Sequence, residues 1–312
     1  LQLQNGNFIL GTISKGVFEL NEQGEIITEI NQKNGLINNT VLSVFEDQDN
    51  NLWLGLDNGI SAINLNSPFS VYHDLDGKLG AVYASALYNN DLYLGTNQGL
   101  FYRENNTGSF KFIQGTKGQV WCLKVYDNTL FCGHNLGTFA IDKEKATLIS
   151  TARGTWDIIP IKNNKNKLLQ GHYNGFNVIE KVGNRWQWKN EIEGFDISSR
   201  YFGFANDLTL FVSHEWKGLF KLKINDDFTK ITTYSIEKNV EKGQHSSLIS
   251  YKDQLYYTTK IGVFKYNKQQ ELFLKDTYLS NKLFAEDTYI SGKLVALETE
   301  NILWGFTAKN II

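Results

Sequence analysis

The chain has 312 residues, with 31 Lys and Arg against 33 Asp and Glu and a formal net charge of −2. Because the basic residues are scattered, the electrostatic footprint of a nucleic-acid-binding domain is missing. No window approaches about 18 uninterrupted apolar residues, so the sequence predicts no membrane-spanning helix. An aromatic content of 13% and only two prolines suit a chain rich in strands.

One pattern recurs along the chain: an apolar strand, a tight turn with a glycine, and a second apolar strand. It occupies residues 8–20, 50–63, 92–102, 130–141, 168–179, 210–222 and 255–266, with a decayed copy at 303–312. The turn glycines lie 38 to 44 residues apart, at Gly16, Gly59, Gly99, Gly137, Gly175, Gly218 and Gly262. Such a period built from short strands indicates a radial or stacked repeat. We expect positive φ at Gly59 and Gly99, which close tight turns.

The unit at residues 35–77 shows the pattern most plainly. Its expected strands are residues 40–46, 52–56, 60–64 and 69–73, joined by turns rich in Asn, Asp and Gly that are typical of hairpins. Successive apolar residues at 52–54 indicate that both faces of the sheet are buried. Four strands in roughly 40 residues, covered on both faces by like sheets, predict the blade of a β-propeller.

The repeats predict one all-β domain over residues 1–312, a β-propeller of four-stranded antiparallel blades. The first unit lacks most of its first strand and the last lacks its fourth, so we expect seven blades, with eight as the alternative. These incomplete ends also suggest an excerpt from a longer protein. The expected units are approximately 1–36, 37–77, 78–116, 117–153, 154–196, 197–242, 243–289 and 290–312.

The two cysteines, Cys122 and Cys132, lie on consecutive expected strands on either side of the turn at Asp127 and Asn128. Cross-strand proximity would permit a disulfide. We favour the simpler interpretation of two small buried hydrophobic residues.

Unusual residues gather at one end of the expected blades. Antiparallel order places the start of each first strand and the turn after each second strand on the same face of the propeller. The position at the start of the first strand reads Val41, Tyr83, Trp121, Trp156 and Tyr201. The residue that follows the second-strand glycine or serine is threonine or leucine in most units, and in three consecutive units it is His134, His172 and His214.

These residues suggest a ligand platform of aromatic rings with imidazole groups beside them. Tyr173, Trp216 and Arg200 would join it, together with Asp157 and Glu215. The alternative is that all of them cap blade ends and pack against neighbouring loops. We predict neither a metal nor a cofactor, because equivalent positions in adjacent blades lie about 10 Å apart, whereas zinc ligands lie about 2 Å from the ion.

Catalytic motifs of the common hydrolases, metalloproteases and redox proteins do not occur in the sequence. Asp157 and Glu215 would make a glycosidase-like pair only at a working separation, which the sequence does not provide. We therefore expect no enzymatic activity from this chain.

Residues 34–47 (NGLINNTVLSVFED), followed by residues 52–60 (LWLGLDNGI), closely resemble the two-component regulator propeller repeat. The match is specific over residues 35–63, good over 92–100 and degenerate in later units. Proteins similar to this are membrane-spanning sensors of gram-negative bacteria, in which a periplasmic half of two propellers and a β-sandwich with a triple-tyrosine motif precedes the membrane. Their output is a histidine kinase or a LuxR-type helix-turn-helix domain, and this sequence looks most like the second kind.

The resemblance implies a periplasmic sensor domain of an inner-membrane-anchored regulator. Its ligand would be a small glycan or an exported protein that biases a dimeric signalling state. Implied partners are the adjacent propeller and β-sandwich domains and a second copy, with no nucleic acid and with membrane contact only through the parent protein. The alternatives are a protein-docking or assembly propeller without a small ligand and, more distantly, a carbohydrate-active enzyme.

Overall fold

The computed structural model describes residues 1–67, 69, 71–106, 109–241, 243, 246–283, 290–297 and 301–307. Regular structure in these ranges is almost entirely β-strand, as predicted, with one α-helix, α1 (Thr277–Leu283), and one 3-10 turn, η1 (Glu104–Asn106). The chain divides into two compact units, Leu1–Gly80 (unit 1) and Ala81–Ile312 (unit 2), which we describe separately. One domain of seven blades stays a prediction.

Unit 1 contains two three-stranded antiparallel sheets. They are formed by β1 (Phe8–Gly11), β2 (Val17–Leu20) and β3 (Ile26–Ile30), and by β4 (Val41–Glu46), β5 (Asn51–Leu56) and β6 (Gly59–Asn64). Val17, Leu52 and Leu54 are fully buried in the core between the two sheets. Because β5 alternates these buried leucines with the exposed Trp53, only one face of its sheet is covered within unit 1.

The fourth strand expected at residues 69–73 is wrong. The described residues of that segment, Phe69 and residues 71–73, have no strand structure. The backbone N–H of Phe69 donates to Ser67 Oγ, and that of His73 donates to the carbonyl of Lys33 at 2.5 Å. Since these donors are used in the loop, they are not available for a ladder with β6.

The ends of the chain follow the predicted pattern of incomplete units. The sheet β1–β2–β3 corresponds to the second, third and fourth strands of a unit. At the other end, β27 (Ile290–Leu297) and β28 (Ile302–Thr307) pair as first and second strands. The expected third strand of the last unit lies at residues 308–312, outside the described residues.

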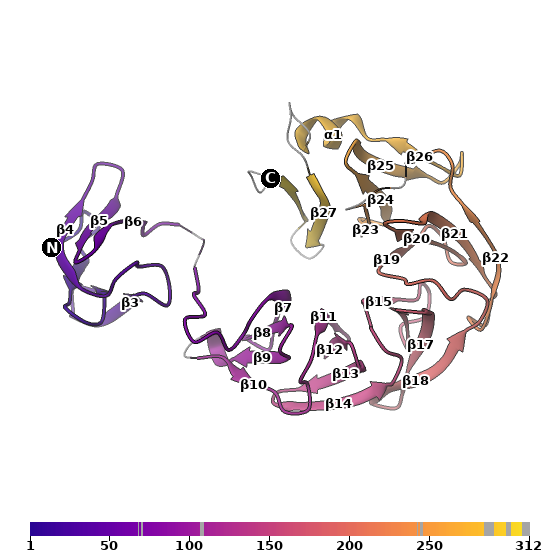
Figure 1. The fold of residues 1–312 in the computed structure, drawn as a ribbon, viewed down its shortest axis with the longest axis horizontal. Helices are drawn as coiled ribbons and strands as arrows, with labels where there is room; N and C mark the ends of the chain where they lie inside the picture. Colours follow the sequence, from indigo (N-terminus) through magenta and orange to yellow (C-terminus); the bar gives the residue numbers. More distant parts are fainter. Residues whose placement is uncertain are drawn as a thin grey trace. The chain divides into compact units, whose positions relative to one another are not determined.

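The described residues of unit 2 form five four-stranded antiparallel sheets besides the β27–β28 hairpin, and each follows chain order across the sheet. In Figure 1 the first strand of each sheet lies on the inner side of an arc and the fourth on its outer side. The sheets are β7 (Val82–Tyr88), β8 (Asp91–Thr96), β9 (Leu100–Arg103) and β10 (Lys111–Phe112); β11 (Val120–Tyr126), β12 (Thr129–His134), β13 (Gly137–Asp142) and β14 (Lys145–Ser150); β15 (Asp157–Pro160), β16 (Lys167–His172), β17 (Gly175–Val182) and β18 (Arg185–Ile192); β19 (Tyr201–Phe204), β20 (Thr209–His214), β21 (Gly218–Ile224) and β22 (Ile231–Ile236); and β23 (Ser247–Tyr251), β24 (Gln254–Thr259), β25 (Gly262–Asn267) and β26 (Leu272–Lys275).

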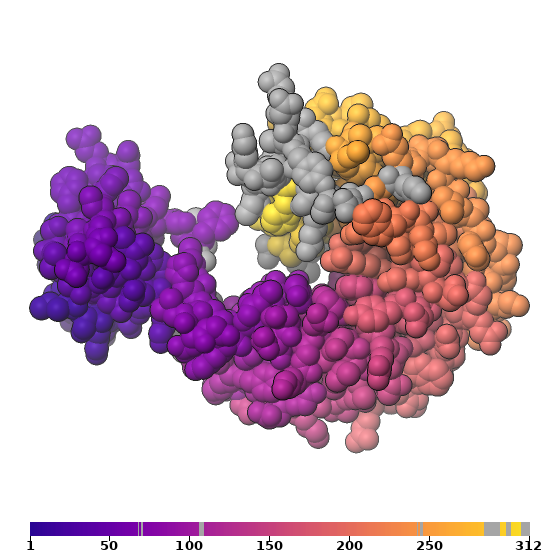
Figure 2. Space-filling view, in the orientation of Figure 1, coloured from indigo at the N-terminus to yellow at the C-terminus, as the bar shows by residue number. Residues whose placement is uncertain are grey.

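Neighbouring sheets of unit 2 pack face to face over aromatic and aliphatic cores. Phe176, from β17, is buried with its ring centroid 5.1 Å from that of Phe202 on the next sheet. Phe211, from β20, is fully buried 5.0 Å from the rings of Tyr266 and Phe273 on the sheet that follows. Figure 2 shows the neighbouring sheets in surface contact from the magenta to the orange part of the chain. The four-stranded, radially packed sheets confirm the predicted propeller fold.

Both cysteines are free thiols, as predicted. Cys122 and Cys132 are buried on β11 and β12, and burial raises the pKa of both thiols. Their role is therefore that of small apolar side chains in the sheet.

The turn glycines have the predicted backbone conformation. Gly59 and Gly99 have φ of 148° and 144°, and Gly137 has φ of 144°. A side chain at Gly99 would also meet the carbonyl oxygen of Thr116 at 2.6 Å. Glycine is required at such a position by both the dihedral angle and the close approach of the backbone.

Candidate functional site

Tyr83 and Trp121 are the extra residues of β-bulges at the start of their strands. The register of β7 against β8 passes from Val82 to Ala84, and that of β11 against β12 passes from Val120 to Cys122. A bulge gives two residues on one strand for one on its partner and redirects the side chain of the inserted residue.

Trp156 has a similar position. Its N–H donates to the carbonyl of Gly171 at 2.9 Å, while Asp157 pairs with the same glycine.

The assignment of Val41 to this repeat position is wrong. In unit 1 the register skips from Val41 to Ser43, so that Leu42 is the bulge residue. Val41 is only 8% exposed and packs in the core, whereas Leu42 is 68% exposed. The same bulge follows Val82 and Val120, so Val41 is equivalent to those valines and Leu42 to Tyr83 and Trp121. The hairpin of β4 and β5 is one residue longer than those in the next two sheets, so the spacing to the second-strand glycine does not align Val41 correctly.

The structure brings the predicted aromatic residues of unit 2 together. The Tyr83 and Trp121 rings stack with centroids 5.2 Å apart, and the Trp121 and Trp156 centroids lie 4.8 Å apart. The guanidinium carbon of Arg200 lies 5.0 Å from the ring centroid of Trp156 and 5.0 Å from that of Tyr201. Tyr83, Trp121, Trp156 and Tyr201, with Arg200 between the last two, thus form one aromatic row across four consecutive sheets.

Hydrogen bonds fix the two indoles within this row. Trp121 Nε1 donates to the hydroxyl of Tyr173 at 3.0 Å, and Trp156 Nε1 donates to Ser198 Oγ at 2.9 Å. Tyr173 also makes an edge-to-face contact with Trp156 at 5.2 Å. Both indoles are half-buried, so they contribute to packing and leave only part of each ring for a ligand. Their N–H groups are already used.

The exposed end of the row is built by Arg200, Glu215 and Trp216. Arg200 Nη1 lies 3.9 Å from Glu215 Oε1, and their side chains are 50% and 33% exposed. Trp216 follows Glu215 in the turn between β20 and β21 and is 65% exposed. The other exposed ring is Tyr83, 42% exposed, at the opposite end.

The three predicted histidines stabilise turns. His134 Nδ1 accepts the backbone N–H of Leu136, and its Nε2 lies 3.1 Å from the carbonyl oxygen of Thr116. His172 Nδ1 accepts the N–H of Asn174, and His214 Nδ1 accepts that of Trp216.

In other units a threonine has the same role. The Thr96 hydroxyl accepts the N–H groups of Gln98 and Gly99, and the Thr259 hydroxyl accepts that of Ile261. An imidazole Nδ1 thus replaces a hydroxyl as the acceptor in the turn. His134 and His172 are buried, whereas His214 is partly exposed beside Glu215 and Trp216. Only His214 therefore lies at an accessible part of the candidate site.

The buried histidines should make the stability of unit 2 depend on pH. Burial lowers the pKa of His134 and His172 below the ordinary value of 6.5. Below about pH 6.5 these histidines therefore bind protons in the unfolded chain but stay neutral in the folded chain. The free energy of unfolding falls as the pH drops from about 6.5 towards the lowered pKa of each histidine, by at most about 1.4 kcal/mol per pH unit for each of them. We expect denaturation curves between pH 7.5 and 5 to show this loss.

The variant His134→Thr tests the source of that pH dependence. It keeps a turn acceptor of the kind found at Thr96 and removes one titrating group. Its loss of stability on acidification should be smaller than that of the wild type. An identical slope for the two proteins would contradict a contribution from His134.

The two carboxylates considered for a glycosidase-like pair each have a cationic partner. Asp157 Oδ1 lies 3.1 Å from Lys124 Nζ, and Asp157 raises the pKa of that lysine. Glu215 faces Arg200 as described above. Among the described residues, no group of three or more His, Cys, Asp or Glu side chains is placed to hold a metal ion. We also find no helical segment in the described ranges with the length and hydrophobicity of a transmembrane span.

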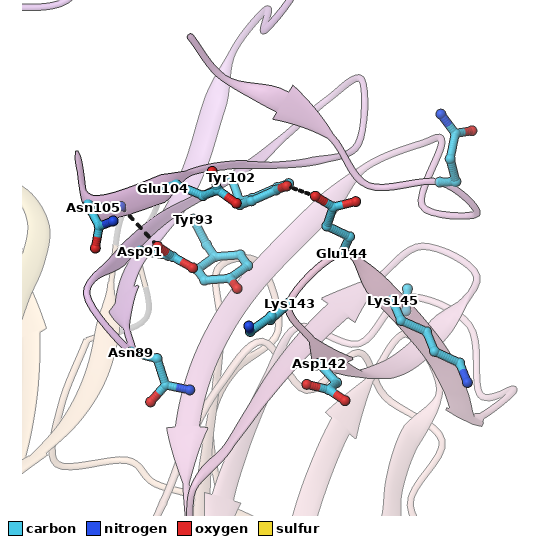
Figure 3. A pocket seen from close by; sticks show the side chains of 12 residues that line it. Asn89, Asp91, Tyr93, Tyr102, Glu104, Asn105, Asp142, Lys143, Glu144 and Lys145 are labelled. Atoms are coloured by element: carbon cyan, nitrogen blue, oxygen red, sulfur yellow. Dashed lines mark hydrogen bonds between the residues drawn. The ribbon is translucent and has the colours of Figure 1, made fainter. Parts of the chain in front are cut away.

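A polar pocket of about 880 Å³ between the first two four-stranded sheets was not predicted (Figure 3). The Tyr102 hydroxyl donates to the carboxylate of Glu144 across the two sheets, and Asp91 accepts the N–H of Asn105 at 3.0 Å. Tyr93 is 1% exposed and has its pKa raised to about 12 by burial. Tyr93 and Tyr102 lie on strands and residues 142–145 span the β13–β14 hairpin, and no local sequence signal distinguishes such a pocket from a packed interface.

Residues 35–58 match the family model described as "Two component regulator propeller". This repeat is the one on which the resemblance was based, and the resemblance is therefore confirmed. No curated protein sequence matches the chain.

Solved structures with a similar fold include the following three. Two are of the extracellular domain of BT4673 from B. thetaiotaomicron, described as a one component system in one case and as a hybrid two component system in the other. They are 17% and 16% identical, with TM-scores of 0.57 and 0.56, and both cover 100% of this chain. The chain spans 46% of their length. The WD40 β-propeller domain of Doa1 is 10% identical, covers 86% of each chain and has a TM-score of 0.52. These likenesses show a β-propeller fold.

Proposed function

We propose that this chain, which carries a two component regulator propeller repeat, is the ligand-binding part of a periplasmic sensor. The domain would belong to a transmembrane signalling or transcription regulator and would act without catalysing a reaction. Its similarity to about half of an extracellular domain described as part of a one component or two component system supports this assignment. Further extracellular domains of the parent protein would be its neighbours.

The observation that carries the proposal is the aromatic row. Four rings from four consecutive sheets and the guanidinium of Arg200 form a continuous series of contacts at one end of the strands. Rigid rings offer large contact areas with little loss of side-chain entropy, which suits stacking against sugar rings. We infer that the row, with Trp216, binds a small glycan. Binding would then bias a dimeric signalling state of the parent protein, as the family resemblance implies.

Trp216 gives a cleaner test than the indoles inside the row. Trp156 is half-buried and hydrogen-bonded, so its removal would alter stability and binding together. Trp216 is largely exposed, and its described hydrogen bond is made by its backbone. We expect Trp216→Ala to weaken binding by roughly tenfold or more, the effect of an anchor residue, and to leave the melting temperature within about 1 °C.

The measurement begins with a panel of neutral and acidic oligosaccharides tested for binding to the wild-type chain. Binding oligosaccharides are then titrated against wild type and Trp216→Ala by calorimetry. Trp188→Ala is the matched control, because Trp188 is also exposed, at 48%, and lies on the outer strand β18. Equal affinities for the two variants would contradict the proposed site. Failure of every oligosaccharide to bind would favour the protein-docking alternative.

A further inference from the structure

The guanidinium of Arg200 is held between two aromatic rings. Its central carbon lies 5.0 Å from the Trp156 centroid and 5.0 Å from the Tyr201 centroid. Cation–π contacts of this kind orient the planar group while its N–H donors remain at the edge of the plane. Half of the side chain is nevertheless exposed to solvent. The arrangement thus fixes a planar cation that a ligand can still reach.

The donors of this guanidinium are not satisfied by the protein. Within the described part of the chain, Arg200 donates no hydrogen bond, although the group offers five N–H donors. The carboxylate of Glu215 is 3.9 Å away, which is an ion contact but longer than a hydrogen bond. A bidentate interaction between an arginine and a carboxylate would be shorter, at about 2.7–2.9 Å. Glu215 therefore leaves the binding edge of Arg200 free.

A second unused donor lies beside Arg200. The hydroxyl of Tyr201 also has no hydrogen-bond partner among the described residues. Burial raises the pKa of Tyr201, so this hydroxyl stays protonated and can donate. Asp157 is the other carboxylate near Tyr201 and also raises its pKa. Its Oδ1 is already paired with Lys124 Nζ at 3.1 Å. The cationic donors of Arg200 thus lie at the exposed end of the aromatic row, and the unused hydroxyl belongs to the partly buried ring of Tyr201 beside it.

We propose that Arg200 and Tyr201 bind a carboxylate of the ligand, so that the domain recognises an acidic saccharide. This inference rests on the proposed function, because the sugar ring would lie against the rings beside Arg200. A planar carboxylate accepts two parallel hydrogen bonds from a guanidinium and a third from the tyrosine hydroxyl. A neutral sugar would leave these donors without an acceptor of matching charge.

The experiment compares two probes with the same sugar backbone: tri-galacturonate, with three carboxylates, and its fully methyl-esterified form, in which each carboxylate is replaced by a neutral ester. Each is titrated by calorimetry into the wild-type chain and into Arg200→Gln. We expect the acid to bind the wild type at least about tenfold more tightly than the ester, and Arg200→Gln to reduce its affinity to that of the ester. Arg200→Lys should restore the affinity only in part, because an ammonium group lacks the planar fork.

Lys217→Gln is the matched control. It removes one positive charge from the neighbouring turn, where the described hydrogen bond of Lys217 is made by its backbone. Its affinity for tri-galacturonate should stay within about twofold of wild type.

Each other outcome is decisive. Equal binding of acid and ester, or the same affinity for Arg200→Gln as for the wild type, would overturn the carboxylate assignment. If neutral oligosaccharides bind as tightly as acidic ones and Trp216→Ala weakens their binding, the proposed function is supported and the carboxylate assignment is contradicted. Absence of binding by both probes, or binding of a glutamate-containing peptide instead, would also overturn it.

Discussion

Replacing Gly137 with alanine is expected to lower the free energy of unfolding of unit 2 by about 3 kcal/mol or more. Gly137 begins β13 with φ of 144°, a conformation that penalises a side chain. An alanine Cβ would lie 2.0 Å from the carbonyl oxygen of Ser150, at the end of β14. Since backbone atoms cannot rotate away, the end of the hairpin would have to shift and weaken its ladder.

The matched control is Gly183→Ala, in the turn between β17 and β18. Gly183 has φ of 60°, but a Cβ there would have nothing within 4 Å. The free energy of unfolding of this variant should fall by only about 1 kcal/mol, because the unfavourable φ is its only source of strain. Urea denaturation followed by tryptophan fluorescence measures both. If Gly137→Ala is no less stable than Gly183→Ala, the end of β14 can shift away from the new Cβ with little loss of free energy of unfolding.

Phe211→Ala is expected to be still more destabilising, by about 3–5 kcal/mol. Phe211 is fully buried between two four-stranded sheets, with Tyr266 and Phe273 each at 5.0 Å between centroids. Its removal leaves a cavity that rigid aromatic neighbours cannot fill, so the loss exceeds the transfer free energy of the ring.

The control for this variant is Tyr278→Ala. Tyr278 lies on α1 and is 70% exposed, so its truncation should change stability by less than about 0.5 kcal/mol. Both variants can be measured by urea denaturation of the same chain. A loss below about 1 kcal/mol for Phe211→Ala would mean that the packing between these sheets contributes little to the stability of unit 2.

The hairpins were predictable because their signals are local. In residues 52–64 the apolar runs and the turn that ends at Gly59 specify two strands and the connection between them, which the structure places at β5 and β6. A fourth strand forms only if the edge strand of the sheet, here β6, is uncovered and if the backbone N–H and C=O groups of the segment are available to pair with it. Residues 69–73 have strand-like composition, yet the N–H of His73 is used by Lys33. Composition alone does not reveal that competition.

The candidate site was predictable in its residues but not in its contacts. The repeat placed Tyr83, Trp121, Trp156 and Tyr201 at one end of the strands, because equivalent positions of a repeat share one location in the fold. Their stacking depends on bulges and on the packing of one sheet against the next. The misassignment of Val41 is an error of one position in the alignment, because the same bulge follows Val82 and Val120 while the hairpin of β4 and β5 is one residue longer.

The sequence by itself determined the repeat, the hairpins, the burial of the cysteines and the gathering of aromatic residues at one end of the strands. These follow from periodicity and turn chemistry, which act over a few residues. Only the tertiary structure decided that His134 and His172 support turns, that Glu215 leaves Arg200 unsatisfied, and that a polar pocket lies beside Tyr93. Each of these depends on distances between atoms set by the packing and backbone path of the folded chain, and a one-dimensional pattern does not contain those distances.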